Sequence, residues 1–559
     1  MSATAIQTRF RDALPPEDER ARWNGFAPGR TVMPAGSRHT PDGRPLGCDV
    51  LCDRDAEVTL PDGTVIYIDI YRPVTDEEVP AILALGPYGK QGGPWNYDLF
   101  PGHAGIPVSN VSGLQKFEGP DPAFWCAHGY AVVNVDARGA YMSGGDVQMF
   151  SPQETQDNYD IIEAIAAEEW CTGRIGLSGN SWLAVTQWLV ATLRPPHLAA
   201  IAPWEGFTDV YRDMICRGGI PGPDFTDQVV ANNFGRNGVE DLPAMLAEQP
   251  LMSDYWRSKQ ADVSLIDVPA YVVASYTNTL HSRGTLEAFS RLNPEKSWLR
   301  IHNTHEWPDL YAYEADLLRF FDATLKQIDN DWADTPRVRL TVLDPGGTDV
   351  VDRPEHEWPL ARAQATVFHL DTATETLTTT PPTPSTSRSY EAETGRLTFT
   401  FTTTEDLEIV GPSRLRIWVE AEGSDDVDLY AFVQKLAADG TPLLSETLPQ
   451  TRVPVATGQL RASHRELDHD KSTPLAPVHT HEREQLLAPG EIVPLDIDLW
   501  PAGIRFHAGE QLQLVISGHD LRSRYLGQAA TTTRNRGRHR LHTGGPHDSH
   551  LLLPLIPQR

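Results

Sequence analysis

Apolar runs alternate with amphipathic segments over roughly the first 335 residues of the chain. Residues 56–72 alternate apolar and polar side chains on both sides of Pro61-Asp62-Gly63, which predicts a β-hairpin. Helical spacing of apolar residues predicts helices at 157–170 and 311–325. Continuous apolar runs predict buried strands, at 80–86, 128–135, 174–177, 198–203, 270–276 and 298–303. This alternation predicts an α/β fold with a mostly parallel sheet that opens with an antiparallel hairpin.

Changes in this pattern divide the chain into five segments. Residues 1–50 are rich in Pro, Gly and Arg, and we expect an arm on the surface of the main body. The α/β core is predicted at 51–205 and 267–335, and a helical cap at 206–266 interrupts it. Residues 336–559 are predicted to form an all-β sandwich, with strands at 337–343, 365–370, 396–402, 413–421, 429–436 and 511–517 and a loop at 372–387.

The amino-acid composition limits the classes of partner and the cellular compartment that we expect. A net charge of −29 argues against a nucleic-acid partner, and the basic run Arg534–Arg540 is predicted to be a solvated loop. Five cysteines are few and odd in number, which favours a reducing compartment. No apolar run approaches the length of a membrane span, so no membrane association is expected. We therefore expect a cytoplasmic protein, and a homodimer is compatible with the sequence.

The strongest chemical signal is the serine in Gly179-Asn180-Ser181. A short apolar strand leads into it and an amphipathic helix follows, which is the arrangement of a nucleophile elbow, G-x-S-x-G. Leu183 stands at the position of the second glycine. Ser178 comes too early and still belongs to the strand, so Ser181 is the candidate nucleophile. The alternative is a serine that merely caps the helix.

Several stretches together resemble the cocaine-esterase and X-prolyl dipeptidyl peptidase family of serine hydrolases. They are D-I-Y-R-P at 69–73, G-P-Y-G-K at 86–90, H-G-Y-A-V-V-N-V-D-A-R-G at 128–139, E-W-C-T-G-R-I-G-L-S-G-N-S-W-L-A-V-T-Q-W at 169–188 and L-E-I-V-G-P at 407–412. The resemblance implies an α/β-hydrolase core, a helical cap and a C-terminal jelly-roll domain of the galactose-binding-like kind.

The resemblance also suggests most of the catalytic groups. The main-chain N–H of Trp182, at the start of the elbow helix, is one expected oxyanion donor. The family's tyrosine in a Pro-Tyr motif matches Tyr88, which gives the second donor. The family's G-P-x-x-H loop matches His305 as the base, and a shift of that loop by one turn would put His302 there instead.

The catalytic acid departs from the family pattern. The family's aspartate follows the strand that corresponds to 270–276, and Asn278 occupies that position here. Asparagine lacks the charge that stabilises an imidazolium. We expect Glu205, just beyond the strand at 198–203, to replace it. Glu306 is expected to point away from its neighbour His305.

These features predict a serine hydrolase that cleaves a small-molecule ester or amide through an acyl-enzyme. Ser181, His305 and Glu205 form the expected triad, and Tyr88 with the Trp182 amide forms the oxyanion hole. No cofactor or metal is expected. The alternatives are an acyltransferase on the same machinery and a non-catalytic binding protein that has lost the triad acid. Trp125, Trp182 and Trp204 are expected to give the pocket an aromatic wall.

Overall fold

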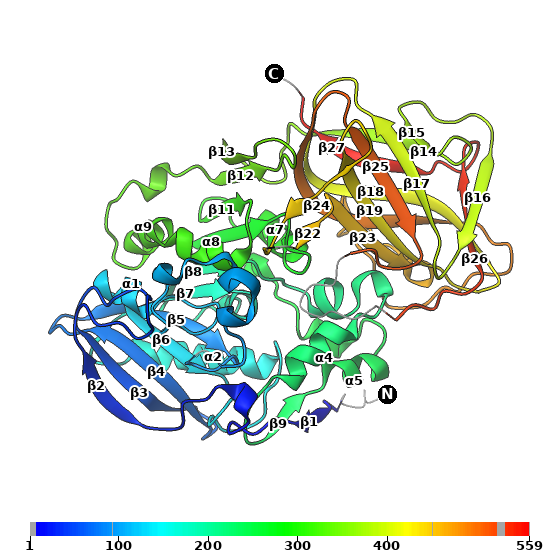
Figure 1. The fold of residues 1–559 in the computed structure, drawn as a ribbon. Helices are drawn as coiled ribbons and strands as arrows, with labels where there is room; N and C mark the ends of the chain where they lie inside the picture. The colour runs from blue at the N-terminus through cyan, green and yellow to red at the C-terminus, as the bar shows by residue number, and fades with distance from the viewer. Residues whose placement is uncertain (1–6, 92, 450, 523–531, 558–559) are drawn as a thin grey trace.

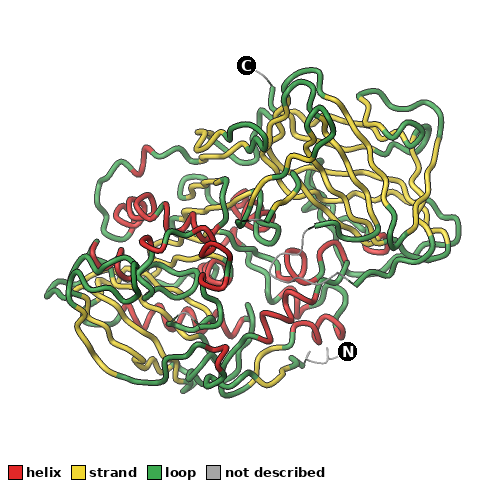
Figure 2. The backbone as a smooth tube through the Cα atoms, in the orientation of Figure 1, coloured by secondary structure: helices red, strands yellow, loops and turns green. Residues whose placement is uncertain are grey.

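A computed structural model describes residues 7–557 except 92, 450 and 523–531. Its two bodies are evident in Figure 1: a helix-covered sheet built from the first 355 residues or so, and an all-strand body coloured yellow to red. Figure 2 shows that helices gather around the first body and that strands and loops make up nearly all of the second. Among the described residues, no helix is long and apolar enough to cross a membrane.

The first body is built on one large sheet. Its strands, in chain order, are β2 (Gly29–Met33), β3 (Val50–Thr59), β4 (Val65–Pro73), β5 (Val79–Gly86), β6 (Ala131–Asp136), β7 (Cys171–Asn180), β8 (Leu198–Trp204), β10 (Ala270–Ser275), β11 (Ser297–His302), β12 (Val338–Val342) and β13 (Val350–Glu355). Within the described chain they lie in the order β13-β12-β11-β10-β8-β7-β5-β6-β4-β3-β2. The run from β6 to β12 is parallel, and the strands at both ends of the sheet are antiparallel. The predicted parallel sheet with an opening hairpin is confirmed.

Helices cover both faces of this sheet. The helices α2 (Pro152–Ala166), α3 (Trp182–Ala191) and α7 (Ser282–Arg291) pack on one face, and α1 (Pro122–Ala127), α8 (Glu306–Ala312) and α9 (Glu314–Thr324) on the other. Successive strand residues point to opposite faces, so Val133 packs with the first set of helices and Val132 with the second. Burial on both faces explains why these strands are apolar throughout.

The cap and the N-terminal segment are joined. The short strand β1 (Phe10–Asp12) pairs with β9 (Gly238–Glu240) of the cap, while β2 extends the edge of the sheet. The segment predicted as a surface arm therefore contributes strands to two sheets. The cap consists of one turn of π-helix (Val210–Ile215), the helices α4 (Pro223–Ala231), α5 (Leu242–Glu248) and α6 (Asp254–Arg257), and the turns between them.

The second body is a β-sandwich. Its strands are β14 (Gln364–Asp371), β15 (Thr376–Thr378), β16 (Thr386–Glu391), β17 (Arg396–Thr402), β18 (Leu407–Glu422), β19 (Asp428–Leu436), β20 (Pro442–Leu443), β23 (Ala456–Arg461), β24 (Val493–Phe506), β25 (Gln511–Ser517), β26 (Arg538–Thr543) and β27 (His550–Leu555). The minor strands β21 (Ser445–Glu446) and β22 (Arg452–Val453) pair separately. An all-β C-terminal body is thus confirmed.

Three local predictions were wrong. The strand predicted at 337–343 exists as β12 but joins the first sheet beside β11, because Val338, Leu340 and Val342 complete the core of that body. The predicted loop at 372–387 contains β15 and the start of β16. The basic run 534–540 leads into β26, where Arg540 forms an ion pair with Glu422, so part of it is strand rather than solvated loop.

Both predicted helices exist with different bounds. The helix predicted at 157–170 begins earlier, at Pro152, because Ser151 accepts a hydrogen bond from the Glu154 amide as an N-cap and Pro152 fits the first turn. The helix predicted at 311–325 is divided at Tyr313 into α8 and α9.

A buried ion pair holds α8 against the end of β11. Arg300 and Asp309 are almost fully buried, and the Arg300 Nη1 lies 3.0 Å from Asp309 Oδ1. The Tyr271 hydroxyl accepts a hydrogen bond from Arg300 Nε at 3.1 Å. Since the loop 303–305 connects these two elements, the pair fixes the position of that loop.

We predict that Asp309→Ala destabilises the protein by about 3–5 kcal/mol, because it leaves the Arg300 guanidinium buried without its carboxylate partner. Glu482→Ala is the matched control: it removes the exposed partner of Arg257, and exposed pairs contribute about 1 kcal/mol or less. Urea unfolding followed by tryptophan fluorescence measures both variants. Equal losses of stability would contradict this account of the pair.

Candidate active site

Ser181 lies on a tight turn between β7 and α3. Its backbone has φ 54° and ψ −120°, a conformation that non-glycine residues rarely adopt. Its amide donates a hydrogen bond to the Glu205 carbonyl at 2.8 Å, which ties the turn to the end of β8. Strain of this kind is typical of functional sites. Ser178, by contrast, lies inside β7 and is 1% exposed.

Leu183, at the position of the second elbow glycine, fits because a nearby residue has no side chain. An added Cβ at Gly179 would lie 2.7 Å from Leu183 Cδ2 and 2.8 Å from the Glu118 carbonyl oxygen. At Gly86, on the neighbouring strand β5, a Cβ would lie 3.5 Å from Leu183 Cδ1, an ordinary van der Waals distance. Gly179 therefore leaves the space that Leu183 fills, and the elbow forms without a glycine at 183.

Tyr88 reaches the serine from the loop after β5. Its hydroxyl lies near the side chains of Ser181 and Glu118, which line the same cavity. Its ring packs edge-on against Trp182 and Phe117, with centroids 6.0 and 5.4 Å away. Burial, with the carboxyl of Glu118 nearby, raises the pKa of Tyr88 well above its usual value. The hydroxyl therefore keeps its proton and remains a hydrogen-bond donor next to Ser181.

Two cavities meet at Ser181 and Tyr88. One, of about 360 Å³, is mostly apolar and is lined in part by Met149, Phe150, Trp182, Phe207 and Met214. The other, of about 450 Å³, adds polar groups and is lined in part by Trp95, Glu118, Asn278, His281, Glu306 and Trp307. Of the tryptophans predicted for the pocket wall, Trp182 lines it, whereas Trp125 and Trp204 are buried in the core beneath the sheet.

Glu205 meets His302 rather than His305. Its Oε1 lies 2.5 Å from His302 Nε2, and both side chains are almost completely buried. The register of the sheet explains the contact: β10 pairs with β8 at Val273 and Trp204 and with β11 at Ser275 and His302. Glu205 and His302 thus stand at adjacent strand ends. The predicted pairing of Glu205 with His305 was wrong in this respect.

His305 lies beside the two cavities, in the described part of the chain, without lining either one. It caps the N-terminus of α8, and its ring packs against Trp307 with centroids 4.5 Å apart. Burial, together with His302 and His281, lowers the pKa of His305 well below its usual value. The role of base proposed for it from the sequence is not tested by these contacts.

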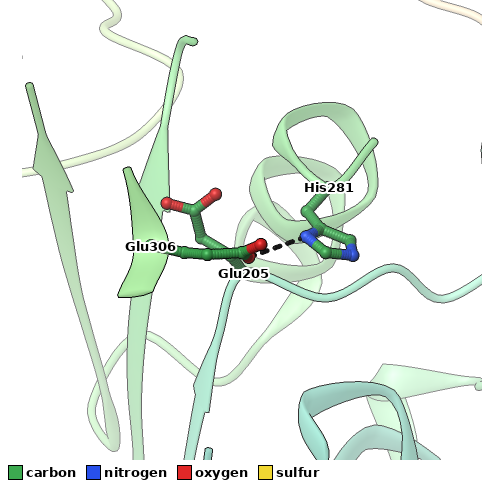
Figure 3. A group of neighbouring side chains, drawn as sticks. All are labelled: Glu205, His281 and Glu306. Carbon is green, nitrogen blue, oxygen red and sulfur yellow. Dashed lines mark hydrogen bonds and ion pairs between the residues drawn. The ribbon is translucent and has the colours of Figure 1, made fainter. Parts of the chain in front are cut away.

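A histidine that the sequence analysis missed occupies the second cavity. His281 follows β10 and precedes α7, and its Nδ1 lies 2.9 Å from Glu306 Oε2 (Figure 3). Glu306, which was expected to point away from its neighbour, turns its carboxylate toward His281. The sequence signal was available: His281 lies three residues after Asn278, in the loop where the family places a catalytic group.

Several buried carboxyl groups surround the serine. Burial, followed by the charge of Glu306, raises the pKa of Glu118 well above its usual value, and Trp307 Nε1 donates to Glu118 Oε1 at 2.8 Å. Burial and the nearby Glu205 likewise raise the pKa of Glu306. One ligand atom each from Glu205, His281 and Glu306 lie within 4.8 Å of one another, so this set could also hold a metal ion.

A serine on a strained strand-to-helix turn of a mostly parallel sheet, with hydrogen-bond donors and histidines beside it, defines a serine hydrolase of the α/β-hydrolase fold. Comparisons with known proteins agree. Residues 62–239 match the model of the X-Pro dipeptidyl-peptidase (S15) family, and residues 330–552 match the C-terminal non-catalytic domain of X-Pro dipeptidyl-peptidase.

The solved structure of a CocE/NonD family hydrolase from Staphylococcus aureus is 35% identical in sequence, with a TM-score of 0.87 over 95% of this chain and 98% of that one. The chain therefore belongs to the CocE/NonD family of hydrolases, and the predicted family and fold are confirmed.

Curated relatives match over shorter stretches. Cocaine esterase of Rhodococcus sp. (strain MB1 Bresler) is 33% identical over 155 residues, which are 28% of this chain and 24% of that protein. A putative serine esterase of Mycobacterium bovis is 30% identical over 217 residues, 38% of this chain and 34% of the relative. The matched stretches thus span about a quarter to a third of these relatives. They agree with the predicted serine hydrolase class.

Proposed function

We propose that the protein cleaves a small-molecule ester or amide through an acyl-enzyme on Ser181. The observation that carries this proposal is the strained Ser181 turn, with Tyr88 beside the serine where two cavities meet. The serine oxygen attacks the substrate carbonyl carbon while a histidine accepts its proton. The leaving group then takes that proton, and water releases the acyl group in the same manner.

The developing oxyanion has two donors. The Trp182 amide lies in the first turn of α3, where main-chain N–H groups have no acceptor within the helix. The Tyr88 hydroxyl supplies the other donor, held in place by its aromatic neighbours. Loss of one donor in a comparable oxyanion hole costs about 2.7–4 kcal/mol of transition-state stabilisation.

The setting supports a small apolar substrate. The cavity that Ser181 lines together with Met149, Phe150 and Phe207 is mostly apolar. The five cysteines are all unpaired, which supports a reducing compartment such as the cytoplasm. A homodimer stays a prediction that size-exclusion chromatography would measure.

Ser181→Ala should abolish ester hydrolysis, whereas Ser178→Ala should retain a substantial part of it, because Ser178 is buried inside β7. A fluorophosphonate probe should label the wild type and the Ser178→Ala variant but not the Ser181→Ala variant. Circular dichroism controls for folding. Activity that survives in folded Ser181→Ala would remove Ser181 as nucleophile and refute the proposed function.

Tyr88→Phe should lower kcat by about 10²–10³-fold with a smaller change in KM, because its hydroxyl binds the oxyanion of the transition state. Steady-state kinetics on a p-nitrophenyl ester measure the effect. The Phe ring preserves the contacts with Trp182 and Phe117. An unchanged kcat would exclude Tyr88 from the oxyanion hole.

Lengthening the acyl chain of p-nitrophenyl esters should raise kcat/KM by about fourfold per methylene until the apolar cavity is full, because each buried CH₂ contributes about 0.8 kcal/mol. A decline should follow beyond that length. X-Pro anilides, assayed in parallel, test the peptidase alternative. A flat profile across the esters would mean that the apolar cavity does not hold the acyl group.

A further inference from the structure

We propose that His281 is the general base and that Glu306 orients it. The loops that supply the base and the acid are then exchanged relative to the expected arrangement. This inference rests on the proposed role of Ser181 as nucleophile. The base then belongs to the loop after β10, and the acid to the loop after β11. The expected arrangement had the acid after β8 or β10 and the base after β11.

The two ring nitrogens of His281 have different surroundings. Nδ1 lies 2.9 Å from a carboxylate oxygen of Glu306, and both side chains are buried. Nε2 is buried and has no hydrogen-bond partner among the described residues. His281 and Ser181 line the same cavity. A catalytic histidine in a serine hydrolase has this division, with Nδ1 held by a carboxylate and Nε2 left for the serine proton.

Asn278 helps to define the proton positions. Its Oδ1 accepts hydrogen bonds from the amides of Leu280 at 2.9 Å and His281 at 3.0 Å, so its NH₂ group faces the other way. That NH₂ group lies 3.0 Å from His281 Nδ1, and Glu306 Oε2 lies 2.9 Å from the same ring nitrogen. The Glu306 carboxylate is the acceptor for a proton on Nδ1. With the imidazole proton on Nδ1, Nε2 carries the lone pair that a base needs.

Stacking also fixes the ring of His281. It stacks on Phe207 with centroids 6.0 Å apart and an interplanar angle of 29°, and Phe207 lines the apolar cavity with Ser181. Phe207 therefore holds the plane of the imidazole beside the cavities that Ser181 lines.

The other two histidines are engaged elsewhere. His302 contacts Glu205 through Nε2, and its Nδ1 lies 3.2 Å from Thr304 Oγ1. His305 Nδ1 lies 3.4 Å from the Trp307 amide nitrogen, and its Nε2 lies 3.9 Å from Glu306 Oε1. Neither ring lines the cavities at Ser181. Of these three histidines, His281 lines a described cavity together with the nucleophile.

The topology of the sheet permits the exchange. In a parallel sheet the loops that follow neighbouring strands meet at the carboxyl edge, where ligands bind. β10 and β11 are adjacent and paired in register, so a group in one loop can contact a group in the other. The loop after β10 can therefore supply the base and the loop after β11 the acid, while Ser181 remains the nucleophile.

The chemical step follows directly. The Ser181 oxygen forms a bond to the carbonyl carbon as its proton moves to His281 Nε2, and the carboxylate of Glu306 stabilises the resulting imidazolium. His281 then gives the proton to the leaving group as the carbon–leaving group bond breaks. In the second half, water attacks the acyl-enzyme, His281 takes its proton, and Ser181 recovers it.

The decisive comparison is between His281→Ala and His305→Ala, assayed by steady-state ester hydrolysis. His281→Ala should lower kcat at least 10³-fold, and added imidazole should restore part of the activity because the variant leaves space next to the serine. His305→Ala should keep kcat within about tenfold of the wild type, without an imidazole effect. Melting temperature and circular dichroism report folding, and His281→Gln serves as a second variant that retains most of the side-chain volume.

Glu306→Gln tests the acid. It should lower kcat by several powers of ten, near the roughly 10⁴-fold loss for the analogous change in a serine protease, with little change in KM. Glu205→Gln should have a smaller effect, because Glu205 contacts His302. A Glu205→Gln variant more impaired than Glu306→Gln would overturn the assignment of Glu306.

Two results would overturn the proposal while leaving the serine hydrolase intact. One is full activity in His281→Ala or His281→Gln when Ser181→Ala is inactive, or imidazole rescue of His305→Ala instead. The other is a stoichiometric metal ion, found by elemental analysis of the purified protein, whose removal abolishes activity and whose binding is lost in Glu306→Gln. Activity in Ser181→Ala would instead refute the proposed function itself.

Discussion

The site depends on one main-chain hydrogen bond, from the amide of Ser181 to the carbonyl of Glu205. Both residues have positive φ, 54° and 55°, at the carboxyl ends of the neighbouring strands β7 and β8. The bond holds two strained turns against each other. One turn lifts the serine side chain to the edge of the sheet, and the other directs the Glu205 side chain toward His302. The strain is sustained because the buried strands beneath overdetermine the position of both turns.

Buried carboxyl groups are the second constraint, since Glu118, Glu205 and Glu306 lie near the nucleophile with little solvent around them. Neighbouring polar groups contact each of them. His302 lies against Glu205, His281 lies against Glu306, and Trp307 donates to Glu118. Unpaired carboxylates would be costly to bury here. The resulting network also fixes the loops after β5, β10 and β11 relative to Ser181.

The sequence predicted the features that arise from repeated local patterns. Buried strands, the hairpin and the elbow each have a periodicity or a motif, and Ser181 and Tyr88 lie where those patterns place them. The sequence failed where contacts depend on register between strands distant along the chain. The contact of Glu205 with His302 depends on the pairing of β8, β10 and β11. The direction of the Glu306 side chain depends on His281, which lies three residues beyond the position that the family pattern marks. The strand at 337–343 resembled its successors in pattern yet completes the core of the first body.

Asn278 also has a role in this network that the sequence did not indicate. From the sequence it indicated a hydrolase that had lost its acid. In the structure its carbonyl oxygen binds the amides of Leu280 and His281 and so builds the turn that precedes α7. Its NH₂ group lies near Glu306 and 3.0 Å from His281 Nδ1. An aspartate at 278 could bind the same two amides, but it would place a second carboxylate beside Glu306 and offer no donor to it. In the proposed arrangement, the amide at 278 therefore supports an acid supplied by the neighbouring loop.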